Sequence, residues 1–234
     1  MNILGIDPSI NGTGFTLLMC NDDETLSYKD IFHIGFTKVK KKEYHKGRLH
    51  ILYLDKFYGD YPYHYRGKLI LEHAFNYFNI NIVDYVAIED YSYGSSGNVF
   101  DIAEMVGSIK NYIYELGIPY KKYPPSSVKG FATNKGNCDK VPMGMVYNSL
   151  KNALESKKFI LDEMDDLDDF VSPKADIVDS FWMAQLLRYE LCYIETKKFP
   201  LDVSTNLDAI IGGKKKSKTL PTIEHPIIRF HNAV

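Results

Sequence analysis

Short apolar runs, separated by turn-forming residues, dominate the first part of the chain. Residues 3–6 predict a buried strand that ends at Asp7, and glycines such as Gly14 predict a tight return into a second strand over residues 13–19. A third strand is expected around residues 28–36. The pattern therefore predicts three antiparallel strands, the first of which ends in an acid.

A further apolar strand and several helices follow. Val86-Ala87-Ile88 predicts a strand that also ends in an acid, Glu89. Apolar residues recurring every three or four positions predict helices, which we expect at 63–78, 99–116, 141–154 and 172–187. The stripe on the helix at 99–116 is typical of core packing, and a dimer seam is the alternative. Ser172 and Pro173 predict the start of the last helix.

Three regions lack a clear period. Residues 38–61 are basic and then rich in tyrosine, and we expect a partly helical excursion over the surface. The composition of 129–140 predicts an exposed, mobile basic loop, and 155–171 is expected to be a solvated connection. Residues 196–234 are expected to form a basic, partly flexible extension.

Composition narrows the class of protein. The 234 residues suit one sizeable α/β domain with additions. The net charge of -2 neither supports nor excludes a nucleic-acid partner, because basic and acidic runs are segregated. Three cysteines without metal-ligand spacing favour a reducing compartment. Without a signal-peptide pattern or a run of ~18 apolar residues, we expect a cytoplasmic protein with no membrane partner.

Four acids form the most specific pattern in the chain. Asp7 and Glu89 end two buried strands, and the carboxyl ends of neighbouring strands meet in a crevice. Asp176 and Asp179 are three residues apart, so they share one face of a helix start. Taken singly, these acids are equally typical of turns and helix caps. Together they predict a site for Mg²⁺ or Mn²⁺, because clustered carboxylates need cations and oxygen ligands select these ions.

The order of these features resembles the RuvC family of Holliday-junction resolvases, in the RNase H-like superfamily, and indicates a phage-type or divergent member. The resemblance spans roughly residues 1–192 and rests on Gly5-Ile6-Asp7-Pro8 with Gly14, Ala87-Ile88-Glu89, Val128-Lys129, Lys140 ahead of a helix, and Lys174-Ala175-Asp176-Ile177-Val178-Asp179.

The resemblance implies an α/β, RNase H-like fold with a mixed five-stranded sheet flanked by helices. The nuclease domain would span 1–195, with an insertion at about 38–61 and the extension at 196–234. The resemblance also implies a homodimer that makes paired symmetric nicks in four-way DNA junctions, with two Mg²⁺ ions per active site. These ions would be held by the catalytic acids Asp7, Glu89, Asp176 and Asp179.

Further residues are expected at the DNA. The resemblance places Lys129 and Lys140 there, and Lys140 would also help to neutralise the transition-state phosphate. Composition adds Lys135 in the same region. The family has an aromatic residue three positions after its glutamate, where this chain has serine, so Tyr91 or Tyr93 is expected to stack on an opened base.

Two other classes of protein share part of the pattern. Actin-like and sugar-kinase-like ATPases also open with a strand, an acid and a glycine turn, but they are normally larger and carry a glycine-rich nucleotide segment late in the chain. A non-catalytic junction-binding or scaffold protein is the other alternative. Four retained acids argue against it, because carboxylates without cations repel DNA.

Overall fold

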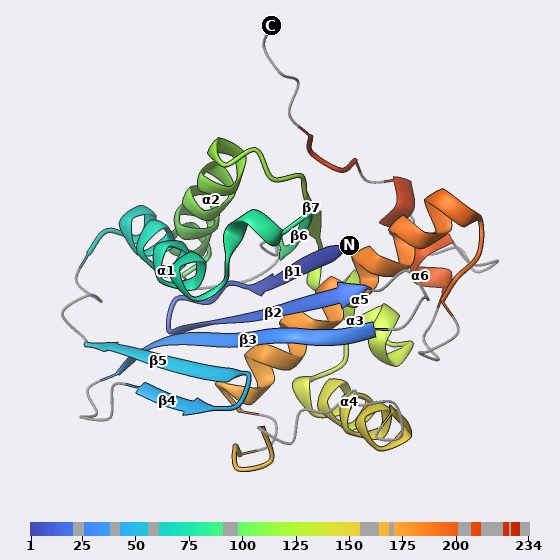
Figure 1. Cartoon of the computed structure of the whole chain (residues 1–234), viewed down its shortest axis with the longest axis horizontal. Helices are drawn as coiled ribbons and strands as arrows, with labels where there is room; N and C mark the ends of the chain where they lie inside the picture. Colours follow the sequence, from blue (N-terminus) through green and yellow to red (C-terminus); the bar gives the residue numbers. More distant parts are fainter. Residues whose placement is uncertain are drawn as a thin grey trace, which may run out of the picture.

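A seven-stranded mixed sheet forms the centre of the computed structural model, which describes residues 1–20, 26–37, 43–55, 61–90, 98–154, 164–168, 171–200, 207–211, 222–224 and 226–229 (Figure 1). The strands are β1 (Asn2–Asp7), β2 (Gly12–Cys20), β3 (Leu26–Thr37), β4 (Glu43–Lys46), β5 (Leu49–Asp55), β6 (Tyr85–Glu89) and β7 (Tyr120–Tyr123). Their order across the sheet is β4-β5-β3-β2-β1-β6-β7.

The sheet contains both antiparallel and parallel strand pairs. β1, β2 and β3 are antiparallel neighbours, as predicted, whereas β6 and β7 continue parallel to β1. On the other side, β5 runs parallel to β3, and β4 forms an antiparallel edge. The predicted mixed sheet is confirmed, but the strand count of five is wrong, because β4 and β5 extend it.

The partly helical excursion predicted for residues 38–61 is also wrong where the structure describes it. Residues 43–46 and 49–55 are the two added strands. Leu49 and Ile51 belong to the core on one face of the sheet, whereas Leu54 belongs to the core on the other. Since β5 is buried on both faces, its sequence shows no clean alternation of apolar and polar residues.

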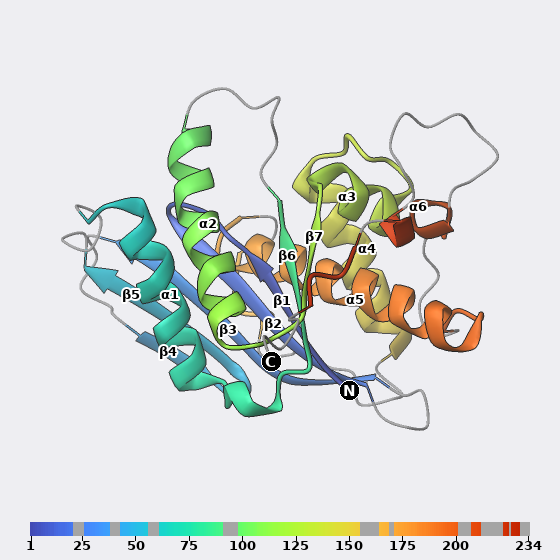
Figure 2. The same ribbon diagram turned by 90° about the horizontal axis from the view of Figure 1, so that it is seen from above.

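Helices cover both faces of the sheet. They are α1 (Tyr63–Tyr77), α2 (Val99–Glu115), α3 (Pro125–Thr133), α4 (Lys140–Leu154), α5 (Lys174–Thr196) and α6 (Asp208–Ile211), with single 3₁₀ turns at Ile80–Ile82 and Thr222–Glu224. Figure 2 shows α1 and α2 on one side of the sheet and α3, α4 and α5 on the other. The long helices were predicted from their apolar periodicity, and Val106, Ile109 and Ile113 of α2 are core residues.

Alternation along the strands decides which side chains face which helices. Leu4 and Ile6 of β1 pack with α1 and α2, so Ile3, Gly5 and Asp7 point toward α5. Val86 and Ile88 of β6 likewise face α1 and α2, which turns Ala87 and Glu89 toward α5. Both strand-end acids therefore lie on the face of the sheet that α5 crosses.

Two glycines allow α5 to approach the sheet closely. A Cβ at Gly5 would overlap the carbonyl oxygen of Ser180, and a Cβ at Gly14 would overlap that of Asp176. The Ser180 hydroxyl also lies 2.8 Å from the Thr16 hydroxyl, which fixes α5 on β2. The reason for glycine at position 14 thus differs from the predicted one: Gly14 lies inside β2, and its missing side chain makes room for a helix.

Some predicted boundaries need correction. Pro173, expected at the first helical position, precedes α5 as its N-cap residue. The exposed basic loop predicted for 129–140 is wrong at its start, because Lys129 lies within α3 and only a short turn separates α3 from α4. Near the C-terminus, Ile228 forms an isolated antiparallel bridge with Tyr120 of the edge strand β7. The division of the chain at residue 195 stays a prediction.

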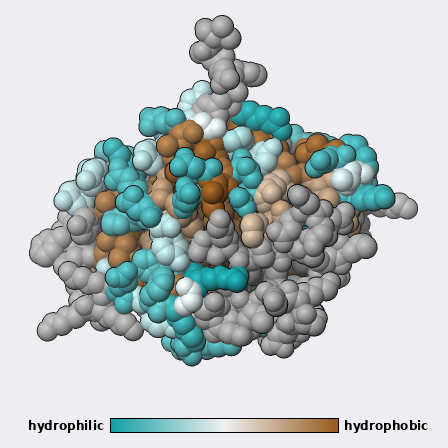
Figure 3. Space-filling view, viewed as in Figure 1, coloured by the Kyte–Doolittle hydropathy of each residue, from teal (hydrophilic) through white to brown (hydrophobic). Residues whose placement is uncertain are grey.

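Apolar residues on the surface are scattered among polar ones. On the face shown in Figure 3, hydrophobic residues are interspersed with hydrophilic ones. The most exposed large apolar side chain among the described residues is Phe100, with 87% of its surface accessible. Among the helices that the structure describes, none combines the length and the apolar character that crossing a membrane requires.

Candidate metal and active site

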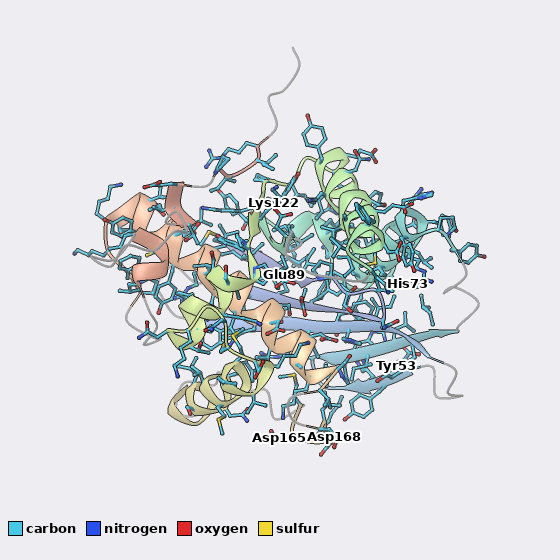
Figure 4. All side chains as sticks on the ribbon, turned by 180° about the vertical axis from the view of Figure 1, so that it is seen from behind. Tyr53, His73, Glu89, Lys122, Asp165 and Asp168 are labelled. Atoms are coloured by element: carbon cyan, nitrogen blue, oxygen red, sulfur yellow. The ribbon has the colours of Figure 1, made fainter. Side chains whose placement is uncertain are left out.

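Asp7 and Glu89 lie at matching positions on neighbouring parallel strands. Ile6 of β1 is paired with Ile88 of β6, and each acid is the next and last residue of its strand. The two side chains are close enough for the charge of Glu89 to raise the pKa of Asp7. Figure 4 looks onto the side of the sheet that α5 crosses and shows Glu89 near the middle of the molecule. The predicted meeting of the two strand-end acids is therefore observed.

The first two turns of α5 add two more acids to this position. The charges of Asp176 and Asp179 both act on Asp7, and that of Asp179 also acts on Glu89. Asp7 and Asp176 are buried, with 6% and 5% of their surfaces exposed, and Asp179 is half-buried. The four acids predicted from the sequence are thus brought together, although 172 positions separate the first from the last.

Burial, together with the neighbouring negative charges, raises the pKa of three of the four acids. Burial, followed by the charges of Glu89 and Asp179, raises the pKa of Asp7 well above its usual value. Burial and then the charge of Asp179 raise the pKa of Glu89 to about 7. Burial also raises the pKa of Asp179 to about 6, although Lys140 opposes the shift. The site therefore holds more negative charge than its surroundings balance.

Lys140, the first residue of α4, supplies a cation inside the cluster. Its Nζ lies 2.8 Å from Asp176 Oδ1 and 3.7 Å from Asp179 Oδ2. Burial opposes its charge, but the charges of Asp176 and Asp7 outweigh burial and raise the pKa of Lys140. The predicted proximity of Lys140 to the acids is observed, and its side chain remains 48% exposed.

His33 is a residue at this site that the sequence did not reveal. Its Nε2 lies 3.2 Å from Asp176 Oδ2 and 3.3 Å from the Ser172 hydroxyl. Burial alone would raise the pKa of Asp176, but the hydrogen bond from His33 and the charge of Lys140 lower it to about 2. Asp176 therefore ionises more readily than Glu89 or Asp179. His33 lies in β3, and nothing in its spacing links it to an acid 143 positions away.

The predicted DNA-binding residues differ in their positions. Lys129 in α3 is close enough for its charge to lower the pKa of both Glu89 and Asp179. Lys135 is exposed in the turn between α3 and α4, where its backbone amide donates to Thr133 Oγ1. Tyr91 and Tyr93 lie outside the described residues.

The donor set fits hard divalent cations in its chemistry and charge. Four carboxylates face the ammonium groups of Lys129 and Lys140, so two negative charges remain unbalanced when every group is ionised. Carboxylate oxygens are the ligands that Mg²⁺ and Mn²⁺ prefer.

In the structure, the acids are bridged by Lys140, which contacts Asp176 and Asp179. Within the described part of the chain, no three His, Cys, Asp or Glu side chains surround one common point as metal ligands do. The two oxygens of Asp176 are directed at Lys140 and His33 instead. Both oxygens of Asp176 thus already have a hydrogen-bond partner within the chain.

Comparison with known proteins identifies a similar enzyme. The chain is 26% identical over 141 residues to the crossover junction endodeoxyribonuclease RuvC of a Nitratiruptor species, covering 60% of this chain and 75% of that protein. The resemblance to RuvC is confirmed. No protein-family model matches the chain.

Several solved resolvases are also similar to this RuvC-like chain. Thermus thermophilus RuvC covers 86% of the chain over its full length, at 17% identity and a TM-score of 0.46. The fowlpox virus resolvase, solved with Holliday-junction DNA, covers 84% of the chain over 99% of its own, at 14% identity and a TM-score of 0.47. Yeast mitochondrial Ydc2, a Holliday-junction resolvase, covers 78% over 75%, at 14% identity and a TM-score of 0.47.

Proposed function

We propose that this chain is a Holliday-junction resolvase, an endonuclease that makes paired symmetric nicks in four-way DNA junctions. The observation that carries the proposal is the meeting of Asp7, Glu89, Asp176 and Asp179 at one end of the sheet. The relative from Nitratiruptor is named for cleavage of crossover junctions, which supports the same substrate for this chain.

The four acids are the proposed ligands of two Mg²⁺ ions, with Mn²⁺ as a substitute. A metal requirement is typical of RuvC-like nucleases. Two such ions, when bound, activate a water molecule and stabilise the leaving oxygen of an in-line displacement. The chain supports them by holding Asp7 and Glu89 on rigid strand ends and by fixing Asp176 through His33.

The lysines are proposed to act on the DNA backbone. With cations held by the four acids, the ammonium group of Lys140, which lies beside Asp176 and Asp179, would contact the phosphate that is being cleaved. Lys129, beside the same acids, and the exposed Lys135 would bind neighbouring phosphates. Tyr91 or Tyr93 is proposed to stack on a junction base.

Paired cuts require two active sites, so we propose that a homodimer is the functional unit. Two copies related by a twofold axis present their sites to symmetry-related strands of a junction.

The ATPase alternative is not favoured, because the curated relative is a nuclease. The remaining alternative is a protein that binds junctions without cutting them, and a cleavage experiment distinguishes it from a nuclease.

The decisive experiment compares a labelled four-way junction with a linear duplex of the same sequence, each with and without Mg²⁺. Symmetric paired nicks on the junction, dependent on Mg²⁺, are the expected result. The matched variant is Asp7→Asn, which keeps the size of the side chain and removes its charge. It should still bind the junction but cut it at least ~100-fold more slowly, as expected from the loss of a metal ligand. Binding without cleavage by the unaltered protein would instead identify a non-catalytic junction binder.

A further inference from the structure

A small pocket opens between α4 and α5, next to the four acids. From α4 it is lined by Lys140, Gly144 and Asn148. These residues are spaced four apart, so they lie along one face of the helix, and the small residue in the middle leaves space between two polar ends. The pocket therefore begins at Lys140, inside the acidic cluster, and leads away from it along α4.

The side of the pocket formed by α5 is also polar at both ends. Lys174, the first residue of α5, and Asp179 line it, with the apolar residues Ala175 and Val178 between them. Lys174 is buried, with 8% of its surface exposed, so its charge reaches the pocket without full hydration. Because Lys174 lies at the helix N-terminus, the helix dipole adds to the positive potential there. Asp179 belongs to both the pocket and the acidic site.

The chemistry of this lining selects an anionic oxygen ligand. The ammonium group of Lys174 and the amide of Asn148 line this small space, and both suit an anionic oxygen better than an apolar group. The carboxylate of the lining, Asp179, lies at the end shared with the acids, where a metal ion would neutralise it.

We propose that this pocket binds a backbone phosphate of the DNA strand being cut, adjacent to the phosphate at the acids. The inference rests on the proposed nuclease function and adds Lys174 and Asn148 to the residues that position the substrate. A DNA strand carries phosphates at regular intervals, so a strand whose cleaved phosphate lies at Asp179 passes its next phosphate over the pocket. Lys174 and Asn148 would thus fix the register of the strand.

The test measures binding of a labelled four-way junction by the full-length protein in EDTA, across a series of NaCl concentrations. Lys174→Gln should weaken binding roughly three- to tenfold and reduce the salt slope by about one phosphate contact, ~0.9 in log-log units. Asn148→Asp, which adds a negative charge at a half-buried helix position, should weaken binding similarly. The control is Lys68→Gln, which removes one positive charge from α1 on the opposite face of the sheet and should leave affinity unchanged.

A second measurement identifies the phosphate itself. Junctions carrying one neutral methylphosphonate beside the cleavage position should bind the unaltered protein more weakly. For the Lys174→Gln protein, the modified and unmodified junctions should bind equally well. Asn148→Asp takes its place if the lysine variant does not fold. Equal losses in the unaltered and variant proteins would overturn the inference, as would a wild-type salt slope in both variants. Either result leaves the nuclease proposal intact, which fails only if the unaltered protein does not cut junctions.

Discussion

His33 shows how one side chain can set the protonation state of a proposed metal ligand, Asp176. Its ring donates from Nε2 to Asp176, which keeps this carboxylate ionised among three acids whose pKa values are raised. Its other ring nitrogen, Nδ1, is buried and has no hydrogen-bond partner in the described structure. The ring is therefore held mainly through its contacts with Asp176 and Ser172.

Removing this ring should weaken metal binding more than it weakens catalysis. With His33→Ala, half-maximal cleavage should require about 10–100-fold more Mg²⁺, the usual cost of losing a partner of a metal ligand. The rate at saturating Mg²⁺ should fall much less. His33→Gln, whose amide can donate to Asp176, should recover part of the affinity. Measuring cleavage rate against Mg²⁺ concentration checks this, and an equal loss at every concentration would argue for a purely structural role.

The sequence reveals some of these residues better than others. Asp7 and Glu89 could be found because each ends an apolar run, and Asp176 and Asp179 because their spacing places them on one helix face. His33 could not be found in this way. It occupies an ordinary inward position in β3, and its importance comes from a contact made only in the folded chain.

Packing of α5 on the sheet positions half of the acids. The helix lies directly against β1 and β2 because Gly5 and Gly14 carry no side chain at the crossing points. The carbonyl group nearest to Gly14 is that of Asp176. Any displacement of α5 there therefore also displaces a proposed metal ligand.

Two alanine substitutions test this close contact. Gly14→Ala should destabilise the protein by about 1–3 kcal/mol or more, because the new methyl group overlaps the backbone of α5. Gly107→Ala, in the interior of α2 with no atom within 4 Å of the added carbon, should stabilise it by about 1 kcal/mol through helix propensity. Urea unfolding of both variants gives the two free energies. Similar values would show that α5 can shift without cost.

The same elements explain why part of the fold could not be predicted. The antiparallel strands and the long helices have clear periods, and they were predicted. β5 was missed because apolar residues face cores on both sides of the sheet, so the run from Leu49 to Leu54 reads neither as an amphipathic strand nor as a helix. The second half of α3, from Lys129, was missed because glycine and lysine are typical of loops.

For the molecule as a whole, the acidic cluster ties stability to pH. The pKa of Glu89 is about 7 when folded and 4.5 ordinarily, and that of Asp179 is about 6 against 3.8. The folded state therefore holds protons that the unfolded state releases between these values. By linkage, the free energy of unfolding falls as pH rises from about 4 to about 7.

This dependence should be visible in the absence of metal. In EDTA, the unaltered protein should lose on the order of 2 kcal/mol relative to Glu89→Gln between pH 5 and pH 8, since one unit of pKa shift corresponds to about 1.4 kcal/mol. Adding Mg²⁺ at pH 8 should recover stability in the unaltered protein and less in the variant. Chemical denaturation at the two pH values measures the difference. If the free energy of unfolding changed equally with pH in both proteins, the pKa of Glu89 would not be raised in the folded state.

The order in which the acids occur along the chain has a consequence for synthesis. Asp7 belongs to the first strand, whereas Asp176 and Asp179 belong to the last long helix. The set is complete only after Asp179 has been translated, and α5 must then dock against strands that were made earlier. Chains that stop short of residue 176 thus carry only two of the four acids and lack the complete cluster.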